Sequence, residues 1–162
     1  MEAHAERVYP EECCGLLIGN LAAAEAAETI KSVVDCVALD NEWTPEAVAE
    51  SDADLDADSK TKHRRYWIDP KDMMRVQKQA RERGLNIIGV YHSHPDHVAV
   101  PSECDRAQAW PTYAYVIVSV CNGKAVDIQN WALDLSRQFQ PEAMRVSSST
   151  SSGAKDRMPV SA

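Results

Sequence analysis

The chain has 162 residues and a formal net charge of −8. This length predicts a single domain, and the acidic balance argues against a nucleic-acid-binding protein, which would need a basic surface. No apolar run approaches the roughly 20 residues that cross a bilayer, and the first seven residues lack the plan of a signal peptide. We therefore expect a cytoplasmic protein without a nucleic-acid or membrane partner.

Short apolar or β-branched runs indicate strands at residues 15–19, 29–38, 66–68, 85–91, 112–121 and 124–133. Capping residues and helical spacing indicate helices at residues 1–9, 70–83 and 102–110. Asp69 is placed to cap the second helix and Gly84 to end it, while Asn122-Gly123 is typical of a tight hairpin. Helices and strands in this order predict an α/β layered domain with a mixed sheet.

Two segments lack the pattern of a packed core. Residues 40–62 carry eight acids and two lysines, which predicts a solvated, mobile insertion. Its alternating aspartates do not match a calcium-binding loop, because the sixth position from Asp52 is Ala57 and the twelfth is His63. The serine-rich tail, residues 146–162, is expected to be disordered, so that the folded domain spans residues 1–135.

The five cysteines do not resemble a disulfide framework. Their number is odd and none forms a Cys-x-x-Cys pair. We expect reduced and mostly buried thiols, as is usual in a cytoplasmic protein.

The most informative stretch is His92-Ser93-His94-Pro95, which follows the buried run 85–91. Side chains two residues apart on an extended chain point to the same face, so the two imidazoles should converge at the end of a strand. Asp105 lies one turn into the next helix and offers a third ligand. Two histidines and one carboxylate are a ligand set typical of a hydrolytic zinc site with one open position.

A hydrolytic zinc site also needs a general base. Pro10-Glu11-Glu12 precedes a buried strand that would carry a glutamate toward the metal, and the residues alone leave Glu11 and Glu12 open. Ser102 and Asp105 also match a capping box, in which the aspartate would turn back to the helix start. We expect that Asp105 cannot readily do both, so the two interpretations compete.

The complete pattern of a glutamate, His-Ser-His-Pro and Ser-x-x-Asp, with seven residues between the second histidine and the serine, resembles the JAMM (MPN+) zinc metalloprotease signature. The upstream Pro-Glu-Glu-Cys-Cys-Gly resembles the family's Pro-x-Glu-x-Cys-Gly segment, which selects Glu12 over Glu11. The resemblance covers roughly residues 1–135. It implies an MPN/JAB1-type, cytidine-deaminase-like fold, with a curved, largely antiparallel sheet flanked by helices.

The resemblance also implies a function. It points to a zinc-dependent isopeptidase or peptidase that cleaves after the C-terminal glycine of a ubiquitin-like or sulfur-carrier protein, and some such enzymes release cysteine in cysteine synthesis. His92, His94 and Asp105 would bind Zn²⁺, and Glu12 would be the general base. Ser102 would donate a hydrogen bond to the attacking water or the developing oxyanion. The carrier's C-terminal tail would lie extended beside a strand edge.

Other functions fit less well. A non-catalytic MPN scaffold, the main alternative, would have broken ligand positions, and none is broken here. A nucleobase deaminase would need His-x-Glu and Pro-Cys-x-x-Cys, which are absent. A cysteine-dependent hydrolase would have to use Cys13 or Cys14. The sequence leaves the oligomeric state open, a homodimer included.

Four neighbours of the motif are secondary candidates. Ser93 is expected to face away from the ligands and to support the strand. His97 lies in the loop and is expected to be solvated. Cys14 and Cys104 neighbour the base segment and Asp105, where a contact with zinc or a redox pairing is a lesser alternative.

Overall fold

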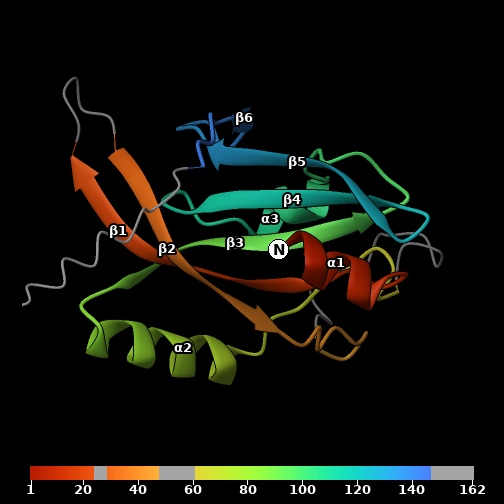
Figure 1. Cartoon of the computed structure of the whole chain (residues 1–162), viewed down its shortest axis with the longest axis horizontal. Helices are drawn as coiled ribbons and strands as arrows, with labels where there is room; N and C mark the ends of the chain where they lie inside the picture. Colours follow the sequence, from red (N-terminus) through yellow and green to blue (C-terminus); the bar gives the residue numbers. More distant parts are fainter. Residues whose placement is uncertain (24–28, 48–60, 147–162) are drawn as a thin grey trace, which may run out of the picture.

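Six strands form one sheet in the computed structural model, which describes residues 1–23, 29–47 and 61–146. The strands are β1 (Cys14–Ala23), β2 (Thr29–Leu39), β3 (Asn86–Pro95), β4 (Ala114–Cys121), β5 (Lys124–Leu133) and β6 (Phe139–Pro141). Their order is β2-β1-β3-β4-β5-β6, as Figure 1 shows. Only β3 and β4 pair in parallel, so the predicted mixed, largely antiparallel sheet is confirmed.

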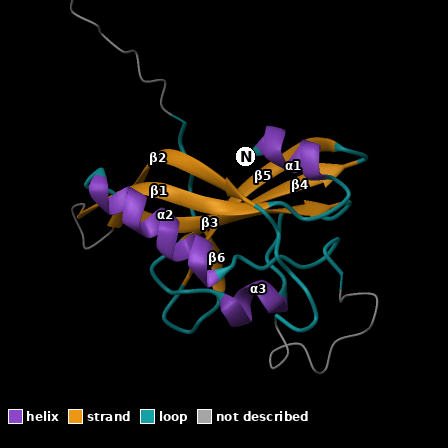
Figure 2. Cartoon of the chain, turned by 90° about the horizontal axis from the view of Figure 1, so that it is seen from below, coloured by secondary structure: helices purple, strands orange, loops and turns teal. Residues whose placement is uncertain are grey.

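The helices cover both faces of the sheet (Figure 2). Helix α1 (Glu2–Val8) packs on one face, where Ala5 joins a core cluster with Leu17 and Ile88. Helix α2 (Pro70–Glu82) packs on the other through Val76 and Ala80. The short helix α3 (Glu103–Gln108) lies within the crossover that joins the parallel strands β3 and β4. Strand β3, with a core on each face, is buried along nearly its whole length.

The sheet is curved, as the sequence predicted. Lys31 lies on β2, one outer strand, and Glu142 directly follows β6, the other. Lys31 Nζ nevertheless lies 2.9 Å from Glu142 Oε1. Because these strands stand at opposite ends of the strand order, the sheet must curl until its two edges approach each other.

The predicted turn and cap chemistry is confirmed. Asp69 Oδ1 accepts a hydrogen bond from Lys71 N at the start of α2. Gly84 follows the helix with φ +69°, a left-handed conformation that glycine adopts at little cost. Asn122 and Gly123 both have positive φ values between β4 and β5, as a mirror-image hairpin turn requires.

Several predicted elements are wrong in type or extent. Residues 66–68 form no strand, because their backbone bonds to the loop at residues 41–43 instead of to the sheet. The short strand β6 was not predicted, and helix α3 ends before Trp110. Strand β3 extends beyond Tyr91 to Pro95, so both histidines lie within it instead of after it.

The two soft segments fall mostly outside the described residues. Of the predicted insertion 40–62, residues 48–60 are not described, whereas Asn41 and Trp43 at its start are buried. Of the predicted tail, only residue 146 is described. Among the described residues, no helix is long and apolar enough to span a membrane.

The expected burial of the cysteines is only partly correct. None of the five forms a disulfide bond, but only Cys13 and Cys14 are buried. Cys36 and Cys121 are exposed, and Cys104 is intermediate.

Gly15 lies where two strands and a ring meet closely, which predicts a large cost for alanine there. A Cβ atom at Gly15 would lie 2.4 Å from the backbone oxygen of Val37 and 2.4 Å from the ring of Tyr91. Because a backbone atom cannot move without shifting a strand, Gly15→Ala should lower the free energy of unfolding by at least about 3 kcal/mol. Urea unfolding measures this loss.

Gly84→Ala is the matched control. Its Cβ would meet nothing within 4 Å, although its φ is +69°. The cost there is conformational alone, about 1 kcal/mol. Equal losses for the two variants would contradict the close packing at Gly15.

Candidate metal centre

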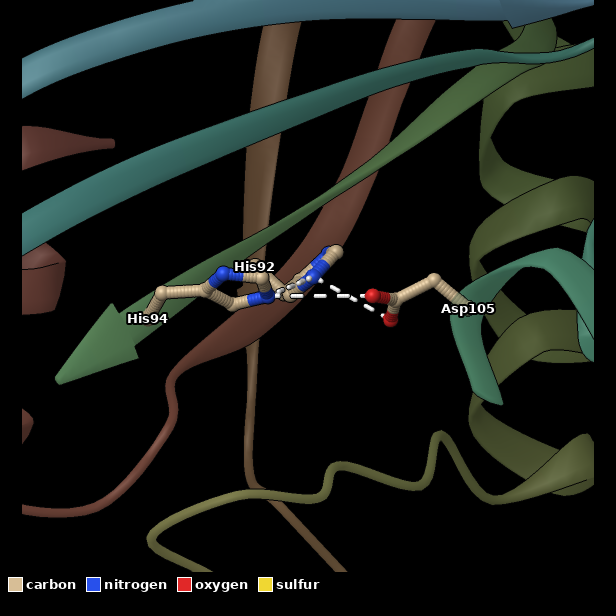
Figure 3. A group of neighbouring side chains, drawn as sticks. All are labelled: His92, His94 and Asp105. Carbon is tan, nitrogen blue, oxygen red and sulfur yellow. Dashed lines mark hydrogen bonds and ion pairs between the residues drawn. The ribbon is translucent and has the colours of Figure 1, made fainter. Parts of the chain in front are cut away.

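Three side chains converge where β3 ends and α3 begins (Figure 3). His92 Nε2 lies 3.1 Å from His94 Nε2 and 3.3 Å from Asp105 Oδ1. His94 Nε2 lies 3.7 Å from Asp105 Oδ2. Within the part of the chain that the structure describes, this is the one group of three such residues whose ligand atoms all lie within 4.8 Å. The three residues that the sequence predicted as a ligand set therefore lie close together in the fold.

The position of β3 explains this convergence. His92 and His94 share one face of the strand, as the two-residue period requires. The chain then passes through the loop to Ser102, which caps α3 and presents Asp105 to the rings. His92 is fully buried and the side chain of Asp105 is 9% exposed, so the ligand atoms are largely removed from water.

A backbone carbonyl fixes the proton position on His94. Its Nδ1 lies 2.9 Å from Val98 O. Because a carbonyl only accepts hydrogen bonds, Nδ1 carries the proton, and the neutral form of the ring presents the Nε2 lone pair to the centre. Nothing in the sequence marked Val98, since any residue can supply this carbonyl.

Asp105 takes part in the helix cap and also lies beside both histidines, two arrangements that the sequence analysis treated as competing. Its Oδ2 accepts hydrogen bonds from Ser102 N and Ser102 Oγ, both at 2.6 Å, and Ser102 Oγ accepts from Asp105 N at 3.2 Å. Its Oδ1 meanwhile faces His92. The geometry shows both arrangements at once, because Oδ2 accepts from the cap and still lies 3.7 Å from His94 Nε2, while Oδ1 lies toward His92.

The charges of the group are coupled. Burial alone would raise the pKa of Asp105, but His92, His94 and Ser102 outweigh it and hold that pKa well below its usual value. Burial lowers the pKa of His92 despite Asp105. Burial also lowers the pKa of His94, but the interaction with Asp105 outweighs burial and raises that pKa overall. The ionised carboxylate of Asp105 therefore faces two imidazole rings, and a proton on one ring disfavours a proton on the other.

Glu12 lies just before β1 and is 5% exposed, whereas Glu11 is only partly buried. Burial raises the pKa of Glu12 to about 8, opposed by His94 and reinforced by Asp105. The mutual influence of these charges places the Glu12 carboxyl in the electrostatic field of the site. Of the two glutamates that the residues alone left open, Glu12 is the one that the fold buries there.

The secondary candidates lie outside the group. Ser93 faces away, and its Oγ accepts a hydrogen bond from Cys13 N at 2.8 Å. His97 is exposed. Cys14 and Cys104 do not belong to the converging set. Burial raises the pKa of both Cys13 and Cys14, which argues against a thiolate nucleophile.

The donor set fits a divalent metal ion. Two imidazole nitrogens and a carboxylate converge, one ring has its outer nitrogen fixed, and the carboxylate is ionised. These are the features that metal ligands need, since each must present a free electron pair. Three protein ligands also leave room for a reacting molecule, as in catalytic sites.

Comparison with known proteins gives one family. The family model described as prokaryotic homologs of the JAB domain matches residues 1–134. The desampylase of Haloferax volcanii is 40% identical over 55 residues, which are 33% of this chain and 40% of that protein. A probable TtuB-protein conjugate cleaving protease of Thermus thermophilus is 36% identical over 52 residues, 32% of this chain and 35% of that protein. The aligned part is thus less than half of either relative.

Two solved structures resemble the whole fold. A protein from Salinibacter ruber is 32% identical, with a TM-score of 0.59, and the match covers 91% of this chain and 85% of that one. A protein from Desulfitobacterium hafniense is 27% identical, with a TM-score of 0.60, and the match covers 86% and 81%.

Replacement of one ligand should abolish metal binding. His92→Ala removes one of three donors, so the purified variant incubated with zinc should retain far less than the roughly one ion per chain expected of the wild type. Elemental analysis after gel filtration measures this content. His97→Ala is the control, because that histidine is exposed on the adjoining loop, and equal zinc contents in all three proteins would refute the ligand set.

Glu12 should contribute stability to the metal-free protein that is lost as pH rises from about 5 to about 8. The folded chain holds the Glu12 proton up to a pKa of about 8, whereas the unfolded chain releases it near 4.5. The unfolded state thus binds fewer protons in this window and becomes favoured as pH rises. At about 1.4 kcal/mol per pKa unit, the loss amounts to a few kcal/mol.

Urea unfolding of the wild type and of Glu12→Gln at several pH values measures this slope. Both proteins retain His92 and His94, so the difference between their slopes reports on Glu12. A Glu12→Gln slope as steep as that of the wild type would show that Glu12 keeps an ordinary pKa.

Proposed function

Because the chain belongs to the prokaryotic homologs of the JAB domain, we propose that it is a zinc-dependent isopeptidase or peptidase. It cleaves after the C-terminal glycine of a ubiquitin-like or sulfur-carrier protein. The observation that carries this proposal is the buried convergence of His92, His94 and Asp105, with Glu12 buried in the same electrostatic field. The names of the two curated relatives, a desampylase and a conjugate cleaving protease, support a conjugate as the substrate class.

His92, His94 and Asp105 hold the metal in this proposal. When bound, zinc supplies a Lewis acid that polarises the scissile carbonyl and lowers the pKa of water. The hydrogen bond of His94 to Val98 O and the two contacts of Asp105 to Ser102 keep the ligand atoms directed toward the centre.

Glu12 is the general base and later the proton donor. Its raised pKa in the metal-free chain results chiefly from burial. A positive charge held between His92, His94 and Asp105 opposes the effect of burial and favours the ionised carboxylate of Glu12, which can accept a proton. The buried carboxylate then takes the proton from the attacking water and transfers it to the leaving amine.

Ser102 is the proposed donor to the developing oxyanion. Its hydroxyl donates to Asp105 Oδ2 at 2.6 Å in this structure. The serine is exposed and lies at the start of α3. To serve the oxyanion, its hydroxyl must turn away from Asp105, and the bond from Ser102 N then continues to hold that carboxylate.

The arrangement of the sheet limits how a substrate tail approaches. Strand β3 carries both histidines, but β1 and β4 occupy its two edges. The pairing with β1 ends at His92, whereas the pairing with β4 continues to Pro95. Within β3, an extended tail therefore has only the edge beyond His92, on the side of β1, for backbone pairing.

A cleavage assay tests the proposed function. The protein is incubated, with and without a zinc chelator, with carrier proteins that bear either a C-terminal cysteine or a lysine-linked protein. Mass spectrometry then identifies the products. Cleavage after the terminal glycine that stops with the chelator supports the proposal, and release of free cysteine assigns the substrate to the sulfur-carrier class. Cleavage that persists in chelator would refute a metal-dependent mechanism.

The role of Glu12 gives a sharper prediction. Glu12→Gln should keep zinc bound and lose about 100-fold or more of the cleavage rate, because the amide cannot accept the proton. Glu11→Gln is the matched neighbour and should cleave at nearly the wild-type rate. Normal cleavage by Glu12→Gln would mean that another residue is the base.

A further inference from the structure

Asn41 lies in the acidic stretch where the sequence predicted a solvated insertion, yet it is only 8% exposed. Its Nδ2 donates to Glu12 O at 3.0 Å and to Arg65 O at 2.8 Å. Its Oδ1 accepts from Trp43 N at 3.0 Å and from Trp67 N at 3.1 Å. Two carbonyl and two amide partners satisfy the complete hydrogen-bonding capacity of an asparagine side chain.

These four bonds connect the segments that border the metal centre. One reaches the backbone of Glu12, the proposed base. Two others reach Arg65 and Trp67, the residues on either side of Tyr66. Since residues 65–69 belong to no helix or strand, side-chain bonds of this kind must fix their backbone.

Tyr66 in turn lies against one of the ligands. Its ring stacks on His92 with centroids 4.5 Å apart and an angle of 26° between the planes. His92 Nδ1 is buried and has no hydrogen-bond partner in the described structure. The Nδ1 atom of His94, by contrast, is held by Val98 O. A ligating histidine is usually oriented by a hydrogen bond from its outer nitrogen. For His92, packing against Tyr66 takes the place of that bond.

We propose that Asn41 is a positioning residue that sets Glu12 and, through Tyr66, His92 in one fixed arrangement. The link from Asn41 to Glu12 rests on the proposed function, whereas the link through Tyr66 to His92 concerns zinc binding alone. The side-chain amide of Asn41 thus links Glu12, just before β1, to His92 on β3. The Lys62 carbonyl, which accepts a hydrogen bond from Glu12 N, adds a second connection between the same two segments.

Asn41→Asp tests the proposal. Aspartate keeps the shape and the acceptor oxygen but cannot donate to both Glu12 O and Arg65 O. We expect zinc affinity, measured by competition with a chromophoric chelator, to fall about 10-fold or more, the usual cost of losing a support of a metal ligand. We expect kcat for conjugate cleavage to fall with KM nearly unchanged, because the substrate contacts remain.

Asn130→Asp is the matched control. The Nδ2 atom of Asn130 also donates a hydrogen bond, at 2.9 Å, but its acceptor is the side chain of Glu142, just after β6. This variant should bind zinc like the wild type. A folded Asn41→Asp variant with wild-type zinc affinity and kcat would overturn the proposal, as would an equal loss of affinity in both variants.

Tyr66 provides a second test that does not depend on the folding of Asn41→Asp. Tyr66→Phe keeps the ring and should bind zinc within about twofold of the wild type, whereas Tyr66→Leu should lose about 10-fold in affinity. Equal affinities in these two variants would overturn the role of the stack. If the wild type cleaves no offered conjugate, the proposed function fails, but the zinc affinities still decide this inference.

Discussion

Three electron-pair donors face one another in a buried place, and the rest of the site depends on this arrangement. Two imidazole nitrogens 3.1 Å apart and a carboxylate oxygen 3.3 Å from one of them repel one another unless positive charge lies between them. A proton or a metal ion can supply that charge. The protein must therefore hold His92, His94 and Asp105 in place by contacts outside the group.

Those supporting contacts differ from one ligand to the next. His94 is oriented by a backbone carbonyl, and Asp105 by a helix cap that uses one of its two oxygens. His92 is oriented by a stacked tyrosine instead of a hydrogen bond. The cap at Ser102 shows how a motif for local structure can also orient a side chain of the site, because the carboxylate that closes the helix start stays directed toward both histidines.

The sheet provides the rigid frame for this arrangement. Strand β3 lies between β1 and β4 and has a core on each face, so both histidines stand on the best-supported strand of the domain. The ion pair of Lys31 with Glu142 joins the two outer edges of the curved sheet. Strand β1 runs antiparallel beside β3, which explains how Glu12, far away in sequence, lies near the histidines.

Local spacing and backbone conformation were enough to predict the converging set His92, His94 and Asp105, the capped helix at Asp69 and the hairpin at Asn122-Gly123. The order of the elements was enough to predict a mixed sheet. The burial of Asn41 could not be predicted in this way, nor could the loop that residues 66–68 form instead of a strand. Both depend on hydrogen bonds between segments distant along the chain, and such partners leave no periodic trace in a sequence.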